Sequence, residues 1–333
     1  MAGGMTMESF WEGFEPFGGD ISYVNREIIK QVSVFSPHPL AAASRHLVEV
    51  GGKRIRPLLV ILSFRSLDQK RDITYAAPIA VAVELIHTAT LIHDDIIDRS
   101  SKRRGVETVF KKWGEVAAIL SGDLLFSRAF GLVGTHEIKE LTEVISDTCI
   151  KLSEGEMLEY RHTGNTDMTE EVYLEIVERK TACLFEACTR CGALLGRGDR
   201  EVVECLARFG RYLGISFQMV DDILDITGGD RFGKPMAIDI REGKVTIAAL
   251  HALKHTSGGD RKTLESIIKK KRKSKKDIDV ASEIIKGAGS IEYASKRAEW
   301  FSKKAEAELG SLPDSEAKAG LVKIARNAIY RPF

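Results

Sequence analysis

Apolar residues recur at spacings of three and four along most of the chain, which is the period of an α-helix. The pattern predicts helices over 76–93, 116–133, 140–160, 172–193, 201–226, 244–254 and 318–330. Gly, Asp and Asn clusters separate these segments, and no long segment alternates β-branched and polar residues as a strand would. Residues 79–92 are apolar on nearly every side, which is typical of a helix at the centre of a bundle. We therefore predict an all-α fold, a large helical bundle with central apolar helices.

Composition supports one large soluble unit. The chain has 333 residues, of which 44% are hydrophobic, and no change in composition divides it. We predict a single all-helical domain over 1–333, with a motif-bearing core at about 45–250 and C-terminal helices over 251–333. The net charge of +1 gives no reason to expect a nucleic-acid partner. The N-terminal residues lack a signal-peptide pattern, and no stretch approaches the roughly 18 apolar residues of a membrane span, so we expect no transmembrane segment and a cytoplasmic protein.

Five cysteines without a secretory context predict free thiols. The spacing of Cys183, Cys188 and Cys191 matches the ligands of plant-type iron–sulfur clusters. Those ligands lie on a loop, whereas this segment has no Gly or Pro until after Cys191, which favours a helical packing seam. The basic run KKKRKSKK at 269–276 is interpreted as a solvated helix end or loop, with transient contact to anionic lipid heads as the alternative.

Two acidic clusters, DDIID at 94–98 and DDILD at 221–225, each follow an apolar segment. Residues four apart share a helix face, so Asp94 and Asp98 point together. Adjacent carboxylates repel one another unless a cation lies between them, and Mg²⁺ prefers carboxylate, water and phosphate oxygens. One cluster could be a solvated helix end, but two copies argue against that. Two such helices facing each other would hold several Mg²⁺ ions with a diphosphate between them.

Other metal sites fit less well. Neither cluster has the alternating ligands, central Gly and late Glu of an EF-hand loop. A ferritin-like bundle needs two Glu-x-x-His pairs and two further Glu residues, and we interpret Glu84-x-x-His87 as too weak a match to that pattern.

Cationic residues lie beside chain breaks and at the ends of apolar segments. The segment GGKRIRP at 51–57 begins with two glycines and continues with Lys53, Arg54 and Arg56 at a helix start, which is an arrangement suited to anions. The further cations are Arg103, Arg104, Lys180, Lys234 and Lys244. Diphosphate recognition needs several charge-assisted hydrogen bonds, and Arg supplies bidentate ones.

Together these motifs resemble the trans-type (head-to-tail) polyprenyl diphosphate synthases, the family of farnesyl, geranylgeranyl and longer-chain synthases. The resemblance covers GGKRIRP, the first aspartate motif with RRG behind it, ERKT at 178–181, FQMVDDILD, and GKPMAIDIREGKVT at 233–246. It implies a Mg²⁺-dependent prenyltransferase that joins isopentenyl diphosphate to an allylic diphosphate through an allylic cation. The departing diphosphate would take the proton, so no side-chain base is expected. A homodimer is the family expectation.

The resemblance also implies roles for single residues. Three Mg²⁺ ions would be bound by Asp94, Asp95 and Asp98 of the first motif and by Asp221, Asp222 and Asp225 of the second. The allylic diphosphate would contact Arg103, Lys180 and Lys244. Isopentenyl diphosphate would contact Lys53, Arg56, His87 and Arg104, and Lys234 is a further candidate for binding diphosphate. Thr181 and Gln218 would flank the developing carbocation.

Among these residues, His87 and Gln218 are supported by their spacing from the aspartate motifs, and Ala237 departs from the family pattern. A lone His on an apolar helix is more often a core residue than a ligand, but His87 lies two helical turns before Asp94 on the same face. Gln218 lies about one turn before Asp221. Ala237 stands where the family usually has Gly, and we expect little effect because Lys234, Asp239 and Lys244 are present.

Product length is expected to depend on residues one turn or more before the first motif, as in the family. Ala89 and Thr90 are small at this position, where short-chain farnesyl synthases usually carry an aromatic residue. Further along the same face lie Ile86 and Ala82, and the candidates for the floor of a product tunnel are Phe126 and Phe130. We predict a product beyond C20, in the C30–C40 range.

Three alternatives are kept. The first is a geranylgeranyl (C20) diphosphate synthase. The second is a terpene cyclase-like or head-to-head condensing relative, against which the RRG and GGKRIRP sites argue. The third is a non-catalytic subunit of a heteromeric synthase, although such subunits tend to lose aspartates that are intact here.

Overall fold

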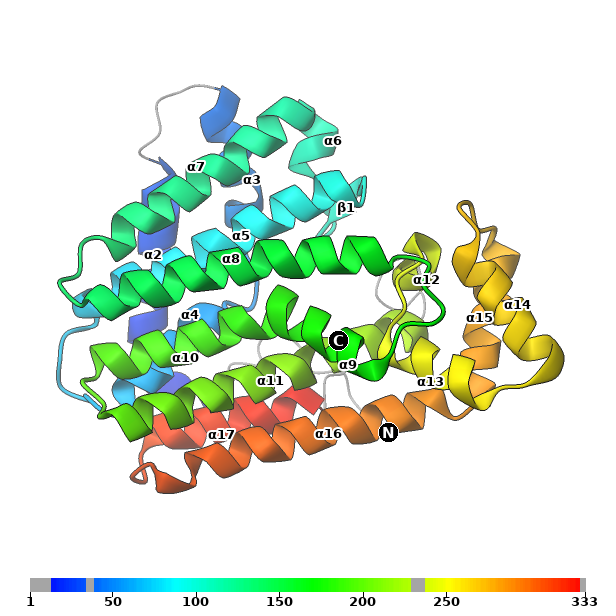
Figure 1. The fold of residues 1–333 in the computed structure, drawn as a ribbon. Coiled ribbons are helices and arrows are strands. Elements are labelled where there is room, and N and C mark those ends of the chain that lie inside the picture. Colours follow the sequence, from blue (N-terminus) through cyan, green and yellow to red (C-terminus); the bar gives the residue numbers. More distant parts are fainter. Residues whose placement is uncertain (1–12, 34–38, 229–236, 330–333) are drawn as a thin grey trace.

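The computed structural model describes residues 13–33, 39–228 and 237–329. Nearly all of these residues are helical, so the predicted all-α fold is confirmed (Figure 1). The elements are η1 (Glu15–Phe17), α2 (Gly18–Ser33), α3 (Pro39–Val50), α4 (Ile55–Arg65), η2 (Ile73–Tyr75), α5 (Ala77–Ile97), β1 (Lys102–Arg103), β2 (Val106–Glu107), α6 (Val109–Trp113), α7 (Glu115–Val133), α8 (Lys139–His162), α9 (Glu170–Val177), η3 (Glu178–Ala182), α10 (Cys183–Leu195), α11 (Arg200–Thr227), α12 (Ile238–Glu242), α13 (Ile247–His255), α14 (Gly258–Lys269), α15 (Lys275–Gly287), α16 (Ser290–Glu308), η5 (Leu309–Ser311) and α17 (Glu316–Ile329).

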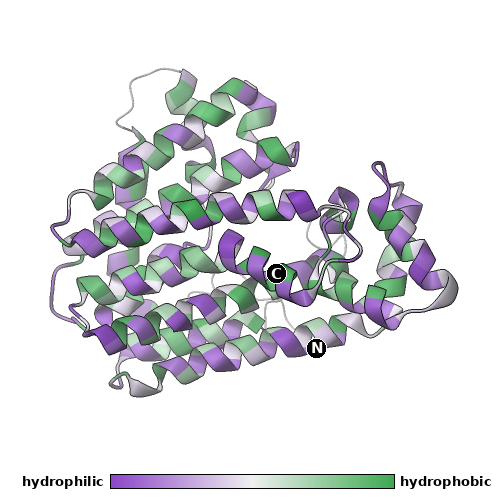
Figure 2. Cartoon of the chain, in the orientation of Figure 1, coloured by the Kyte–Doolittle hydropathy of each residue, from purple (hydrophilic) through white to green (hydrophobic). Residues whose placement is uncertain are grey.

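Two hydrophobic clusters stabilise the bundle, and α11 contributes to both. The larger one joins α2, α3, α4, α5, α7 and α10, and the smaller one joins α9, α13, α15 and α16. On α11, Leu213 belongs to the first cluster and Ile215 to the second. Figure 2 shows apolar and polar residues alternating in bands along most helices, as expected for helices that bury one face. The helix α5 is buried along most of its length, as its sequence predicts.

Polar side chains mark where several helices begin. Thr108, Thr169 and Asp199 accept hydrogen bonds from backbone N–H groups in the first turns of α6, α9 and α11. Ser274 and Asp277 form a reciprocal capping box at the start of α15. These caps satisfy amides that have no partner within the helix.

The predicted helix over 172–193 is interrupted. It runs as α9, a π-helical turn η3, and α10. The neighbouring helix α8 approaches this turn at Gly155, where an added Cβ would lie 2.5 Å from the backbone nitrogen of Lys180. Only glycine permits this approach, which no periodicity within 172–193 could reveal.

The expectation about membrane spans needs a correction at α7. By length and hydropathy, α7 is the one helix of the described ranges that could cross a membrane, although 39% of it is buried inside the bundle. It packs against α5 on one side and exposes Val116, Ile119 and Leu120 on the other. The apolar residues of α7 therefore fall into two groups, one packed against α5 and one exposed on the opposite side of the helix.

The cysteines of the iron–sulfur alternative are free thiols on one helix. Cys183, Cys188 and Cys191 are buried in α10, and burial raises the pKa of the Cys191 thiol to about 12. Next to them, Gly192 packs against the backbone of α4, where an added Cβ would lie 2.6 Å from the Val60 carbonyl oxygen. The segment is a packing seam and not a cluster-binding loop.

Candidate active site

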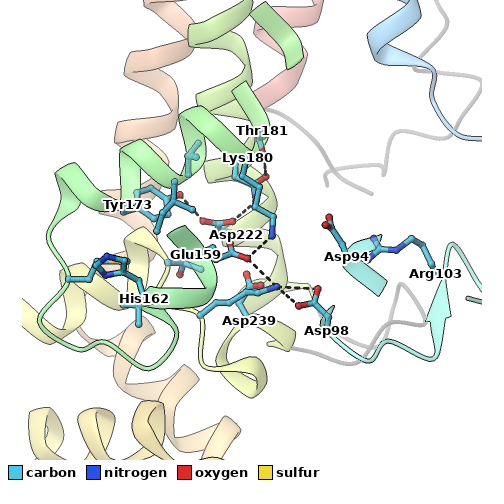
Figure 3. Close-up of a pocket in the computed structure, with 17 residues that line it drawn as sticks. Asp94, Asp98, Arg103, Glu159, His162, Tyr173, Lys180, Thr181, Asp222 and Asp239 are labelled. Carbon is cyan, nitrogen blue, oxygen red and sulfur yellow. Dashed lines mark hydrogen bonds and ion pairs between the residues drawn. The ribbon is translucent and has the colours of Figure 1, made fainter. Parts of the chain in front are cut away.

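A cavity of about 190 Å³ opens where α5, α8, α9, η3 and α11 meet (Figure 3). Five carboxylates line it: Asp94, Asp98, Glu159, Asp222 and Asp239. Three cations line it: Arg103, Lys180 and Lys244. The cavity therefore has more carboxylates than cations, an excess that a bound divalent cation would offset.

The first aspartate motif ends α5 at the cavity. Burial, reinforced by Glu156 and Asp98 and opposed by Lys180, raises the pKa of Asp94 to about 7. Asp95 is fully buried and accepts a hydrogen bond from Arg103 Nε at 2.7 Å. The second carboxylate oxygen of Asp95 has no hydrogen-bond partner among the described residues.

The RRG segment forms a tight hairpin that sends two arginines in different directions. Arg104 (φ 50°) and Gly105 (φ 82°) connect β1 to β2, and both have positive φ, as a type I′ turn requires. Arg103 contacts Asp95 at the cavity, whereas Arg104 donates to the carbonyl of Gly51. The hairpin thus links the first aspartate motif to the GGKRIRP segment.

Two lysines share one partly buried glutamate, Glu159. Glu159 Oε2 lies 2.5 Å from Lys180 Nζ and 3.5 Å from Lys244 Nζ. Despite its burial, these two lysines lower the pKa of Glu159, so it is ionised. Lys180 also pairs with Glu156 at 2.6 Å, and Lys244 with Asp98 at 3.3 Å. These ion pairs hold the ammonium groups of Lys180 and Lys244 at the same cavity.

In the second motif, Asp222 is the centre of a hydrogen-bond chain. It accepts hydrogen bonds from Tyr173 Oη at 2.7 Å and from Gln218 Nε2 at 2.8 Å. Thr181 Oγ1 in turn donates to Gln218 Oε1 at 2.8 Å. Burial raises the pKa of Asp222 to about 7 although both hydrogen bonds lower it. The chain joins α9, η3 and α11 on one side of the cavity.

Asp225 organises the segment after the second motif. Its two carboxylate oxygens accept from the backbone amides of Ile238 and Asp239, each at 3.0 Å, at the start of α12. The residue before α12, Ala237, has φ 51°, a conformation that favours glycine. Ala at this position, where the family usually has Gly, is therefore in a strained backbone conformation, which the sequence did not indicate. Lys234 lies outside the described residues.

The cations of the GGKRIRP segment have separate roles. Arg54 is buried and pairs with Glu84 at 2.5 Å, so Glu84 serves as a counterion and not as a ferritin-like ligand. Arg56 has a buried Nε without a hydrogen-bond partner among the described residues, and its guanidinium lies 4.9 Å from the centre of the Phe185 ring. Burial, followed by the charges of Arg56 and Arg104, lowers the pKa of His87 well below its usual range. His87 is thus a neutral donor or acceptor beside two guanidinium groups.

The residues expected to set product length lie on α5 and α7. Ala89 and Ile86 are fully buried, and Thr90 Oγ1 donates to the His87 carbonyl. Phe126 is partly buried, with its ring centre 6.1 Å from that of His93. Phe130 is 37% exposed, so within this chain its ring is only partly enclosed.

The donor set fits divalent metal ions that are shared with a substrate. No three His, Cys, Asp or Glu side chains of the described segments are arranged to hold an ion by themselves. Mg²⁺ typically takes one or two carboxylates and completes its shell with water and phosphate oxygens. Such an ion would coordinate the Asp95 oxygen that has no hydrogen-bond partner among the described residues, and it would favour the ionised form of Asp94, whose pKa is raised to about 7.

Sequence reasoning missed Glu156, Glu159 and Tyr173. Each lies within an ordinary amphipathic helix, and the one available signal was the spacing of the two glutamates, which puts both on one face of α8. Their importance follows from contacts with Lys180 and Asp222, which are distant in sequence.

Comparison with known proteins agrees with this geometry. A family model described as polyprenyl synthetase matches residues 37–285. The chain is 40% identical over 312 residues to a short chain isoprenyl diphosphate synthase of Methanothermobacter thermautotrophicus, covering 92% of this chain and 95% of the relative. It is 34% identical over 313 residues to the octaprenyl diphosphate synthase of Escherichia coli, covering 94% and 96%. The crystal structure of polyprenyl synthase from Caulobacter crescentus CB15, complexed with calcium and isoprenyl diphosphate, matches with a TM-score of 0.92 and 32% identity over 99% of each chain. The chain therefore belongs to the polyprenyl synthetase family and is a prenyltransferase that makes a polyprenyl diphosphate.

Proposed function

We propose that this enzyme joins isopentenyl diphosphate head to tail to an allylic diphosphate, with Mg²⁺, and makes an all-trans product longer than C20. The observation that carries the proposal is that aspartates from α5 and α11 line the same cavity as Lys180 and Lys244. Calcium and isoprenyl diphosphate occur together in the Caulobacter crescentus relative, which supports a shared metal–diphosphate site.

The allylic diphosphate would bind at the cavity. Lys180, Lys244 and Arg103 would donate to its oxygens, and the substrate would replace some of the contacts these groups make with carboxylates. Three Mg²⁺ ions held by Asp94, Asp95, Asp98, Asp221 and Asp225 would supply charge neutralisation as the C–O bond breaks. Asp222, whose two oxygens already accept hydrogen bonds, would position its neighbours more than it binds metal.

Isopentenyl diphosphate would bind on the other side of the RRG hairpin. Lys53, Arg56, Arg104 and neutral His87 would hold its diphosphate. Arg104 lies against Gly51 and Gly52, so this second site would adjoin the first through the hairpin. Holding the two substrates side by side would place the double bond next to the allylic cation. Thr181 and Gln218 line the cavity where that cation would form.

The product tail would run along α5 past Ala89, Ile86 and Ala82, where no aromatic side chain interrupts the face. A tail of more than four isoprene units, in the C30–C40 range, would then extend toward the start of α5. Phe126 would not be its floor, because the Phe126 ring lies beside His93, next to the first aspartate motif. Relatives are named as short-chain and as octaprenyl synthases, so the family alone does not determine length. A C20 product is the alternative.

A homodimer is also proposed. The exposed apolar side chains of α7 include Val116 (71% exposed), Ile119 and Leu120, and those of α8 include Ile150 and Met157. Apolar patches of this kind on a soluble enzyme are typical of subunit contacts. Light scattering should give twice the chain mass of 36.9 kDa; a monomer at micromolar concentration would refute the dimer.

The test of the reaction is a product assay. Purified enzyme is incubated with labelled isopentenyl diphosphate, Mg²⁺ and either geranyl, farnesyl or geranylgeranyl diphosphate, and the dephosphorylated products are sized. We expect products beyond C20 and no incorporation with excess EDTA. Products that stop at C20 would retain the reaction and refute the proposed length. No incorporation from any primer would indicate a subunit that needs a partner, and a cyclic product would indicate a cyclase.

A further inference from the structure

The longest run of basic residues in the sequence, at 269–276, spans the end of α14, the connection to α15 and the start of α15, and we call it the polybasic loop. Residues 258–287 contain ten basic and five acidic residues, a net charge of +5 in a chain whose total is +1. Figure 1 shows α14 and α15 as a pair at one end of the molecule beyond α12 and α13, and the tip that joins them is hydrophilic in Figure 2.

Most cations of the polybasic loop are not neutralised by the protein. Lys270 pairs with Asp277 at 2.7 Å, and Lys273 Nζ donates to the backbone carbonyls of Lys270 and Arg241. The other five make no ion pair within the described ranges and are exposed: Lys269, Lys271, Arg272, Lys275 and Lys276. Asp279 is the exposed acidic residue closest to them in sequence. Five like charges held together at a surface repel one another, so an anionic surface that covers them would be stabilising.

The polybasic loop adjoins the active site. Lys273 reaches Arg241 at 3.4 Å, and an added Cβ at Gly243 would lie 3.4 Å from Lys273 Nζ. Gly243 immediately precedes Lys244, which lines the cavity. A surface that contacts the loop would therefore lie close to the rim of the cavity.

The chemistry of the product indicates which anionic surface the polybasic loop contacts. A polyprenyl diphosphate has an anionic head and a long apolar tail, and the tail is far more stable in a bilayer than in water. From this combination we propose that the polybasic loop docks the enzyme on a membrane with anionic lipid headgroups, which brings the cavity rim to the surface that receives the product. The contact is electrostatic and peripheral, because it depends on lysines and not on an inserted apolar segment.

Vesicle sedimentation of the full-length enzyme tests this. Vesicles of phosphatidylcholine alone are compared with vesicles containing 30 mol% phosphatidylglycerol, a composition chosen to give a negative surface of roughly the strength that binds polybasic segments. We expect binding to the anionic vesicles, little binding to the neutral ones, and release at high salt. Equal binding to both vesicles, or no binding to either, overturns the proposal.

Matched variants locate the contact. One variant replaces the five unpaired cations of the loop by Gln, and the control replaces five exposed lysines on other surfaces by Gln: Lys70, Lys111, Lys139, Lys151 and Lys296. Both lose five charges. The loop variant should bind anionic vesicles at least about tenfold more weakly, whereas the control should bind nearly as the native enzyme does. Equal losses in the two variants would mean that net charge alone matters and would overturn the loop assignment.

Two further experiments test whether the polybasic loop binds an anion other than lipid headgroups. In buffer without vesicles, the loop variant should retain its KM values for both substrates, because none of the five residues is placed in the active site. A several-fold rise in KM would show that the loop gathers soluble diphosphates and would overturn the membrane assignment. Competing RNA that displaces the enzyme from anionic vesicles at a mass ratio well below that of the lipid would identify nucleic acid as the partner and would also overturn it.

Discussion

The hydroxyl of Tyr173 donates a 2.7 Å hydrogen bond to Asp222 Oδ2, which joins α9 to α11 at the cavity. Tyr173 is buried, and the other oxygen of Asp222 accepts from Gln218. Because Gln218 also accepts from Thr181, one carboxylate orients two residues proposed to flank the carbocation. Tyr173 is therefore a positioning residue that acts through Asp222.

Replacing Tyr173 with Phe should lower kcat. The change removes one hydroxyl and leaves the ring, so Asp222 loses a hydrogen bond whose loss in a buried site costs about 1–3 kcal/mol. We expect kcat to fall about tenfold, a rise in the Mg²⁺ concentration for half-maximal rate, and no change in KM for isopentenyl diphosphate. Steady-state kinetics at several Mg²⁺ concentrations would measure all three.

The matched control is Tyr293→Phe. Tyr293 donates a 2.5 Å hydrogen bond to Glu170, about one turn before Tyr173 on α9, and neither residue lines the cavity. Its variant should keep the native kcat. If the two variants lose kcat equally, Tyr173 merely stabilises α9.

The two hairpin arginines should separate the two substrates. Arg103 contacts Asp95 and Arg104 contacts Gly51, so Arg103→Gln should raise KM mainly for the allylic diphosphate and Arg104→Gln mainly for isopentenyl diphosphate. A charge-assisted hydrogen bond contributes about 1.5–3 kcal/mol, which corresponds to roughly a 10- to 100-fold change. Initial rates with one substrate saturating would measure each effect. A rise in the same KM for both variants would contradict the two-site arrangement.

Ala237→Gly should stabilise the enzyme. Ala237 has φ 51°, and a left-handed conformation costs a non-glycine residue about 1–2 kcal/mol, which exceeds the roughly 0.5–1 kcal/mol of added unfolded-state entropy of Gly. The free energy of unfolding should rise by up to about 1 kcal/mol in urea denaturation. Ala319→Gly, at an exposed position of α17, is the control and should lose up to about 1 kcal/mol. A loss at both positions would show that the strain at Ala237 is not relieved.

Ala89→Phe should shorten the product. Ala89 is fully buried on α5 five residues before Asp94, so a phenyl ring there would close the proposed tunnel near its start. Ala82→Phe lies about two helical turns further from Asp94, so its product should be longer than that of Ala89→Phe and shorter than the native one. Products would be sized by chromatography after dephosphorylation. Unchanged length in Ala89→Phe would exclude this path for the tail.

Periodicity alone predicted the helices well where each buries an apolar face. The central helix α5 and the long helix α11 were both recognised in this way, and the two aspartate motifs were correctly placed at their ends. The break at η3 was not predicted, because the π turn depends on the approach of α8 at Gly155. Local sequence carries local conformational preference, but it does not carry the distance between two helices.

The same distinction between local pattern and distant contact applies to the residues of the candidate site. The amino-acid sequence was sufficient to identify the family, the aspartate motifs and the cationic segments, because each motif is a contiguous set of residues with a recognisable spacing. It could not distinguish Arg54, which pairs with Glu84, from Arg56, which stays available near His87. The folded structure was needed to show that Glu159 pairs with both Lys180 and Lys244 and that Tyr173 donates to Asp222, because these contacts join helices that are distant in the chain. Ion pairs and hydrogen bonds form between groups that meet in space, and folding alone brings them together.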